Sequence, residues 1–217
     1  MDPEFWHQRW NENQIAFHER EGNVLLAAHF KDLGLGEGAR VFVPLCGKTR
    51  DIAWLLSKGC RVVGAELSRL AVEQLFEELG LEPEITAQGT LPHFAGPDLD
   101  IFVGDIFDLT QETLGPVDAV YDRAAFVALP ETMRGDYSRH IAKITAAAPQ
   151  LLITFEYDQT AMPGPPFSIT TGEVHSLHED HYGITALASV DVAGGLKGRC
   201  KADENVWLLQ PSGGGKA

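Results

Sequence analysis

The fold is decided by residues 40–68, RVFVPLCGKTRDIAWLLSKGCRVVGAELS. Two short runs rich in β-branched residues, 40–45 and 60–68, indicate buried strands. Between them, residues 51–59 have helical apolar spacing and stop at Gly59, a residue type that commonly ends helices. A strand, a helix and a strand in this order predict two parallel strands joined by a right-handed crossover.

The same alternation continues along the chain. Helices are predicted over residues 70–80, where Ser68 is the expected cap, and over residues 131–147. The other predicted strands cover residues 99–109, 117–126, 149–157, 183–192 and 204–210. Because no helical segment separates the last two, they are expected to pair antiparallel. We therefore predict an α/β fold with a doubly wound, Rossmann-like, seven-stranded sheet, mostly parallel with a C-terminal antiparallel hairpin.

Length and composition favour a single domain. The chain has 217 residues, of which 44% are apolar, enough for one core. We expect that domain over residues 1–210, with an N-terminal helical lid over about 1–35 and a flexible tail at 211–217. Trp6 and Trp10, four residues apart, lie on one face of the first helix. They predict either a core stripe or a cover over a ligand.

Charge and cysteine content exclude several classes of protein. The net charge of −14 makes nucleic acid a poor partner, and no long apolar run or basic cluster predicts contact with a membrane. Three cysteines without a signal peptide favour a reducing cytoplasm. HEDH at 178–181 is too weak a pattern for a metal site, so no metal is expected. A monomer is the default expectation.

Glycine or charged residues follow four successive predicted strands, at the edge where open α/β sheets bind ligands. Gly47 allows a close backbone approach to a ligand, and Glu66, nineteen residues later (66 − 47), suits ribose hydroxyls. Asp105 and Ile106 suit an adenine ring, and Arg123 lies at the same edge. The single glycine is not the GxGxxG phosphate loop, which argues against a nicotinamide oxidoreductase.

Each position alone has a simpler interpretation. Gly47 alone indicates an ordinary turn, Glu66 a solvated strand end, and Asp105 a helix cap. The Asp122–Arg123 pair alone indicates a salt bridge at the rim of the sheet. Four such positions at one edge of one sheet together favour a ligand site.

Six segments of the chain resemble the thiopurine S-methyltransferase family. They are WHQRWNENQIAFHE (6–19), PLCGK (44–48), VVGAELS (62–68), GDIFDL (104–109), YDRAA (121–125) and PGPPF (163–167). The resemblance covers residues 5–167, and the last fifty residues depart from it. It implies a class I methyltransferase fold with S-adenosyl-L-methionine as cofactor.

The resemblance also implies a role for individual residues. Leu45 would contact the methionine part of the cofactor, Glu66 the ribose, Asp105 and Ile106 the adenine, and Arg123 the methionine carboxylate or the substrate; Trp10 would cover the cofactor and Phe17 would touch the substrate. Arg123 would position reactants, and no dedicated general base is expected. A covalent role for Cys46 is disfavoured, because no histidine lies near it in the sequence.

The implied reaction is methyl transfer to the sulfur of an aromatic or heterocyclic thiol such as a thiopurine. Selenium or tellurium compounds are further expected substrates, with a role in detoxification and metalloid resistance. Two alternatives stay open. The enzyme could methylate nitrogen or oxygen of another small molecule, or the protein could bind the cofactor without catalysis.

Overall fold

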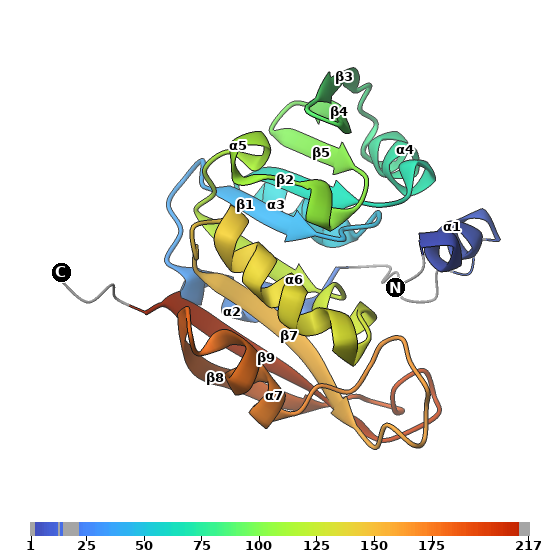
Figure 1. Ribbon diagram of the computed structural model, residues 1–217, viewed down its shortest axis with the longest axis vertical. Helices are drawn as coiled ribbons and strands as arrows, with labels where there is room; N and C mark the ends of the chain where they lie inside the picture. Colours follow the sequence, from blue (N-terminus) through green and yellow to red (C-terminus); the bar gives the residue numbers. More distant parts are fainter. Residues whose placement is uncertain (1–2, 13, 15–21, 213–217) are drawn as a thin grey trace.

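The computed structural model describes residues 3–12, 14 and 22–212. Within them, nine strands form one sheet in the order β3-β4-β5-β2-β1-β6-β7-β9-β8 (Figure 1). The strands are β1 (Arg40–Pro44), β2 (Arg61–Glu66), β3 (Glu84–Gln88), β4 (Leu91–Gly96), β5 (Leu99–Val103), β6 (Ala119–Arg123), β7 (Gln150–Tyr157), β8 (Tyr182–Asp191) and β9 (Ala202–Pro211).

The helices connect and flank these strands. They are α1 (Pro3–Asn11), α2 (Val24–His29), α3 (Arg50–Ser57), α4 (Arg69–Leu79), α5 (Gln111–Leu114), α6 (Glu131–Ile144) and α7 (Thr171–His178), with the 3-10 turns η1 (Phe30–Leu33), η2 (Ile106–Asp108) and η3 (Phe126–Ala128). Ser68 caps α4 as predicted, because its side chain accepts a hydrogen bond from the backbone N–H of Ala71. No helix in the described ranges is long and apolar enough to cross a membrane.

The predicted number of strands was wrong. The five central strands, β5, β2, β1, β6 and β7, are parallel, and β8 and β9 form the predicted antiparallel pair. The sequence pattern missed the hairpin of β3 and β4, which extends the sheet antiparallel to β5. All five residues of β3 are exposed and Pro92 interrupts β4, so neither strand has the buried run that marked the others.

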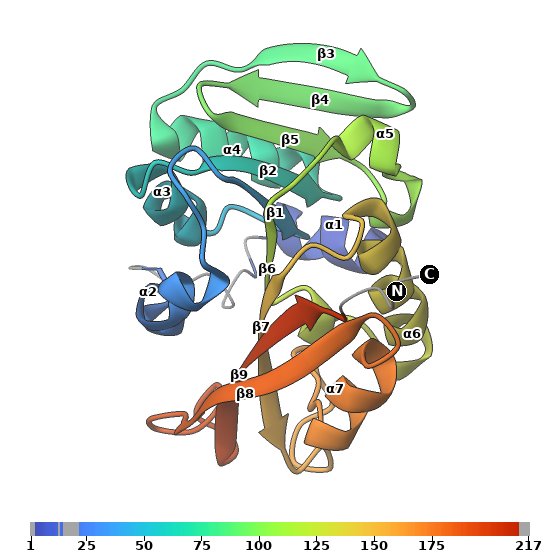
Figure 2. The same cartoon turned by 90° about the vertical axis from the view of Figure 1, so that its left-hand side faces the viewer.

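Alternate residues of each central strand pack into two separate cores. Val41 and Val43 of β1 face one core, while Phe42 faces the other. The first core is covered by α2, α3 and α4, and the second by α5, α6 and α7. Figure 2 shows α2 and α3 on one side of the sheet and α6 and α7 on the other. Because both faces of the sheet are buried, these strands appear in the sequence as continuous apolar runs.

The direction of winding reverses at β1. The chain passes from β1 to β2 on one side, and β6 later pairs with β1 on the other side. Such a switch point opens a crevice beyond the carboxyl ends of the strands, where ligands bind. Leu45 after β1 and Ala124 after β6 both have positive φ, 46° and 72°. Non-glycine residues rarely adopt this conformation, and strain of this kind concentrates at functional sites.

Candidate functional site

A cavity of about 370 Å³ opens at the carboxyl ends of the central strands. Its size suits a small-molecule site. Seven residues singled out from the sequence line it: Trp10, Leu45, Gly47, Glu66, Asp105, Ile106 and Arg123. The structure thus brings these residues together, although their roles remain predictions. Phe17, the predicted substrate contact, lies outside the described residues.

Glu66 is the best-fixed polar group in the cavity. It ends β2, and only 6% of its surface is exposed. One carboxylate oxygen accepts the backbone N–H of Gly47 at 2.8 Å, and the other accepts that of Ser68 at 2.8 Å. Burial raises the pKa of Glu66, while these backbone donors oppose the shift. Each oxygen keeps acceptor capacity for a further hydroxyl donor, which two adjacent ribose hydroxyls would supply.

Gly47 and Trp10 meet at the turn after β1. Gly47 has a φ of 51°, and a Cβ added there would lie 3.1 Å from Cζ2 of the Trp10 ring. The ring therefore lies directly on the backbone of the turn, and 4% of Trp10 is exposed. Helix α1, which carries Trp10, packs against α4 beside the cavity. This contact seats the N-terminal helix over the edge where the ligand would bind.

Asp105 and Ile106 form the wall after β5. The carboxylate of exposed Asp105 caps η2, since its Oδ1 accepts the N–H of Phe107 at 3.0 Å. The simpler interpretation of Asp105 as a cap is therefore correct, and it is compatible with contact to a ligand, because Asp105 also lines the cavity. The Nε2 atom of His140 lies 2.8 Å from the carbonyl oxygen of Ile106, which ties this turn to α6.

The two charged residues that end β6 have different environments. Asp122 is fully buried beneath the turn, so it is not the exposed rim residue that the pair alone suggested. Its carboxylate accepts the Tyr137 hydroxyl at 2.6 Å and the Phe126 N–H at 3.0 Å. Burial raises the pKa of Asp122 to about 6. These contacts hold the turn from which Arg123 reaches the cavity.

Cys46 lies in the same turn as Gly47 but packs inward. A Cβ on Gly64 of β2 would lie 2.9 Å from its sulfur, so the thiol fills the space that this glycine leaves. Burial and the charge of Glu66 raise the pKa of the Cys46 thiol well above its ordinary value. A protonated, packed thiol is a poor nucleophile.

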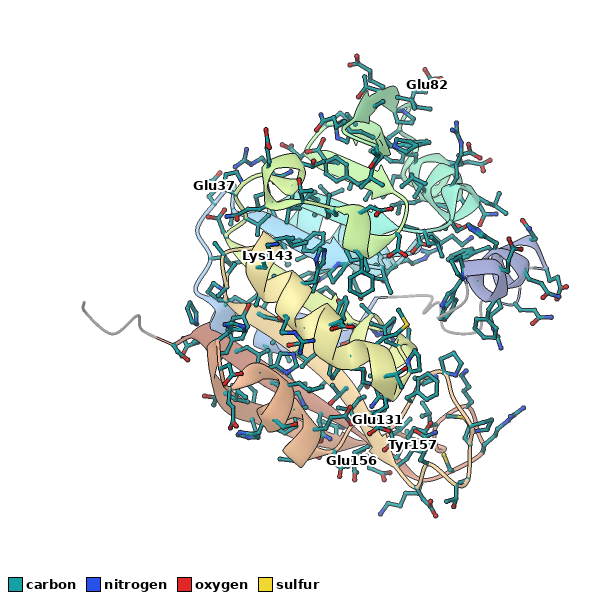
Figure 3. The ribbon with its side chains drawn as sticks, viewed as in Figure 1. Glu37, Glu82, Glu131, Lys143, Glu156 and Tyr157 are labelled. Carbon is teal, nitrogen blue, oxygen red and sulfur yellow. The ribbon has the colours of Figure 1, made fainter. Side chains whose placement is uncertain are left out.

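The far wall of the cavity comes from loops that follow β7 and β8. Pro165 and Pro166 line it, as do Leu196 and Lys197 from the connection between β8 and β9. The hydroxyl of Tyr157, which Figure 3 labels at the end of β7, donates to the carbonyl of Pro166 at 2.7 Å. Sequence reasoning noted the prolines but missed Lys197. A lone lysine in a glycine-rich connection gives no signal before the fold is known.

Comparisons with known proteins identify relatives of this chain. The family model described as thiopurine S-methyltransferase matches residues 1–211. A thiopurine S-methyltransferase of Xanthobacter autotrophicus is 58% identical over 211 residues, covering 97% of this chain and 99% of the relative. One from Gluconobacter oxydans is 45% identical, covering 95% of this chain and 94% of the relative.

Solved structures share the fold at low sequence identity. A 1,6-didemethyltoxoflavin-N1-methyltransferase from Burkholderia thailandensis, with bound S-adenosylhomocysteine, aligns with a TM-score of 0.64 at 16% identity, covering 96% of this chain and 87% of the other. An S-adenosylmethionine-dependent methyltransferase from Anabaena variabilis aligns with a TM-score of 0.64 at 14% identity, covering 96% and 95%. The match to the family model and to these relatives assigns the chain: it belongs to the thiopurine S-methyltransferase family and is an S-adenosylmethionine-dependent methyltransferase.

Proposed function

We propose that the protein transfers the methyl group of S-adenosylmethionine to the sulfur of an aromatic or heterocyclic thiol. The observation that carries the proposal is the buried Glu66 carboxylate, held between two backbone N–H groups at the switch point of the sheet. It supports a ribose site in a cavity whose opposite walls are largely apolar. Family membership supports sulfur as the methyl acceptor.

The residues around Glu66 fit the rest of the cofactor. Asp105 and Ile106 present an acceptor and an apolar surface, which suit the edge and the face of adenine. Leu45 and Gly47 bring backbone close to the cavity, and Arg123 offers a guanidinium for the methionine carboxylate or the substrate. When bound, S-adenosylmethionine supplies a methyl group already activated by its sulfonium charge.

The contribution of the chain is mainly positioning and the exclusion of water. Trp10 covers the turn after β1, and Pro165 and Pro166 form a stiff wall against which a planar ring can lie. Orientation of two reactants contributes on the order of 7 kcal/mol or more to a bimolecular step. Aromatic heterocyclic thiols are more acidic than an ordinary thiol, so much of the substrate reaches the site as thiolate and no dedicated base is expected.

The test has two stages. Calorimetric titration with S-adenosylmethionine and S-adenosylhomocysteine measures cofactor binding, and incubation with benzenethiol and 6-mercaptopurine followed by mass spectrometry measures S-methylated product. We expect binding and S-methylation. Binding without product from either thiol would refute the sulfur assignment. Methyl transfer from the cofactor to an amine or hydroxyl compound would then favour a nitrogen or oxygen acceptor.

The location, assembly state and further substrates of the enzyme in the cell are also proposed. We propose that the enzyme acts in the cytoplasm as a monomer on small molecules, and that selenium or tellurium compounds are among its substrates. The test is to grow cells that express the protein with selenite or tellurite. Release of methylated selenium or tellurium products from these cultures would support a role in detoxification. Cultures expressing Glu66→Ala are the matched control, because that variant should lose the cofactor.

A further inference from the structure

The cavity lining holds a larger share of basic side chains than the chain as a whole. The whole sequence has 31 acidic and 17 basic residues. Among the described residues, four basic and three acidic side chains line the cavity: Arg9, Lys48, Arg123 and Lys197, and Glu66, Asp105 and Glu204. An acidic protein that gathers cations in one cavity creates a local potential that favours a negatively charged ligand.

Two of these cations come from opposite ends of the chain. Arg9 belongs to α1, and Lys197 lies on the connection between β8 and β9. The ammonium of Lys197 donates to the carbonyl of Pro165 at 2.8 Å, which holds it beside the proline wall of the substrate side. Both residues line the same cavity, so the N-terminal helix and the C-terminal hairpin meet there.

Within the part of the chain that the structure describes, neither Arg9 nor Lys197 forms an ion pair with a carboxylate. The guanidinium of Arg9 lies over the ring of Phe5, 4.6 Å from its centroid, and its buried Nε atom makes no hydrogen bond with the described residues. By contrast, Lys48 forms an ion pair with Glu78 at 2.7 Å. A buried donor without an acceptor is costly, so the Nε atom of Arg9 favours an acceptor on a bound ligand.

The two cations also repel each other. Partial burial is the largest cause of the lowered pKa of Lys197, and the charges of Arg9 and Arg199 add to it. Among the described residues, the ammonium of Lys197 donates only to the neutral carbonyl of Pro165, and its side chain is exposed at the cavity rim. An anion between Arg9 and Lys197 would relieve this repulsion and satisfy both groups.

We propose that Arg9 and Lys197 form a subsite that binds the substrate as an anion, specifically the ionised sulfur of an aromatic thiol. This inference rests on the proposed function, because it names the ionisation state in which the substrate enters the same cavity. The substrate sulfur forms the new S–C bond as the bond from the methyl carbon to the sulfonium breaks. The electron pair of the broken bond remains on the cofactor sulfur, and no proton has to move.

The subsite acts on binding more than on the chemical step. Cations that bind the thiolate about equally in the ground state and in the transition state lower KM and leave kcat nearly unchanged. Replacement of Lys197 by Gln keeps a hydrogen-bond donor for Pro165 but removes the charge. We expect Lys197→Gln to raise KM for benzenethiol and to leave kcat within about twofold.

Binding without turnover gives the sharper test. The enzyme is saturated with S-adenosylhomocysteine and titrated with pentafluorobenzenethiol, an acidic thiol ionised at neutral pH, and with its neutral S-methyl ether. We expect Lys197→Gln and Arg9→Gln each to weaken binding of the thiolate by about tenfold and to leave binding of the ether unchanged. Lys197→Arg should restore the affinity. Lys201→Gln, which removes the same charge from an exposed position just before β9, is the matched control.

Three results would overturn the subsite. Equal losses for thiolate and ether would make Lys197 a structural residue. Loss of S-adenosylhomocysteine affinity would assign the cations to the cofactor carboxylate, and no binding of either ligand to the native enzyme would refute an aryl thiolate site. Thiolate binding with no methylated thiol in the turnover assay would refute the proposed function while leaving the subsite intact.

Discussion

The two sides of the cavity are built in different ways. The side proposed for the cofactor consists of short turns that directly follow β1, β2, β5 and β6, and backbone hydrogen bonds fix them, as at Glu66. The side proposed for the substrate consists of α1 and of long connections after β7 and β8. Side chains such as Tyr157 and Lys197 hold these connections by reaching across to Pro166 and Pro165. The first side is encoded locally and the second depends on the finished fold.

The largest effect is expected on the cofactor side, from Glu66→Ala. The variant removes the acceptor for two hydroxyls and the link between Gly47 and Ser68, so affinity for S-adenosylhomocysteine should fall by on the order of 1,000-fold. Calorimetry measures the loss. The control is Glu73→Ala, which removes an exposed carboxylate paired with Arg69 on the neighbouring helix. Unchanged affinity of Glu66→Ala for S-adenosylhomocysteine would show that Glu66 does not bind the cofactor. The contrast between the two sides of the cavity would then lose its support.

The next effect concerns Asp122, the buried carboxylate beneath the turn of Arg123. Its pKa is about 6 in the folded protein against an ordinary value of 3.8, so between these values the folded state holds more protons than the unfolded state. The stabilisation from the protonated form is present below about pH 4 and is lost as pH rises through 6, a change of about 3 kcal/mol.

Asp122→Asn removes this titration. The free energy of unfolding of the native protein, minus that of the variant, should decrease between pH 4 and pH 7, as measured by urea denaturation at each pH. Parallel curves for the two proteins would show that Asp122 titrates alike in both states, and that the turn does not depend on its burial.

Arg123→Ala tests the residue that lies between the two sides. If Arg123 positions the reactants, the variant should lower kcat by on the order of 30-fold and weaken S-adenosylhomocysteine binding much less. Steady-state kinetics and calorimetry together separate the two effects. Arg61→Ala, at the opposite end of β2 and exposed, is the control for loss of a guanidinium. Equal losses in turnover and affinity would place Arg123 wholly on the cofactor side.

A smaller effect is expected from Gly47→Ala. Gly47 is the residue of the turn after β1 that contacts Trp10 of α1. The methyl group would meet the Trp10 ring in a backbone conformation that alanine adopts at a cost of about 1–2 kcal/mol. Cofactor affinity should fall by about tenfold, and tryptophan fluorescence should change as the ring moves. Gly36→Ala is the control, since its added methyl group has open space. An unchanged fluorescence spectrum would show that the ring does not depend on this contact.

The smallest effect is expected from Cys46→Ala. Because the thiol is buried and its pKa is raised, it stays protonated and takes no part in methyl transfer. Turnover should stay within about twofold, and stability should fall by about 1 kcal/mol because the thiol packs against Gly64. Cys60→Ala, a second buried cysteine outside the cavity lining, is the reference for stability. Complete loss of turnover would reopen a covalent role.

The sequence predicted for a physical reason which residues gather at the side of the cavity proposed for the cofactor. An apolar run in the sequence marks each buried strand. Because the strands are parallel, the residues that follow them must lie at the same edge of the sheet. Gly47, Glu66, Asp105 and Arg123 are therefore placed by local pattern alone. The edge hairpin of β3 and β4 was missed because β3 has no buried residue to mark it.

The substrate side has no comparable signal. Arg9 and Lys197 are 188 residues apart (197 − 9), and only the completed sheet brings them to one cavity. The PGPPF segment was recognised, yet its contacts with Tyr157 and Lys197 depend on where β7, β8 and β9 end. Long-range meetings of this kind follow from topology rather than from residue pattern.

The contact of Trp10 with Gly47 has a consequence for how the enzyme can vary. Helix α1 lies this close to the turn after β1 because Gly47 in that turn lacks a side chain. A change that reshapes this turn therefore also displaces the helix, and a bulkier ring on the helix presses on the turn. The cover and the turn are not independent modules. Substitutions that retune one of them need a matching substitution in the other, so the two segments are expected to vary together.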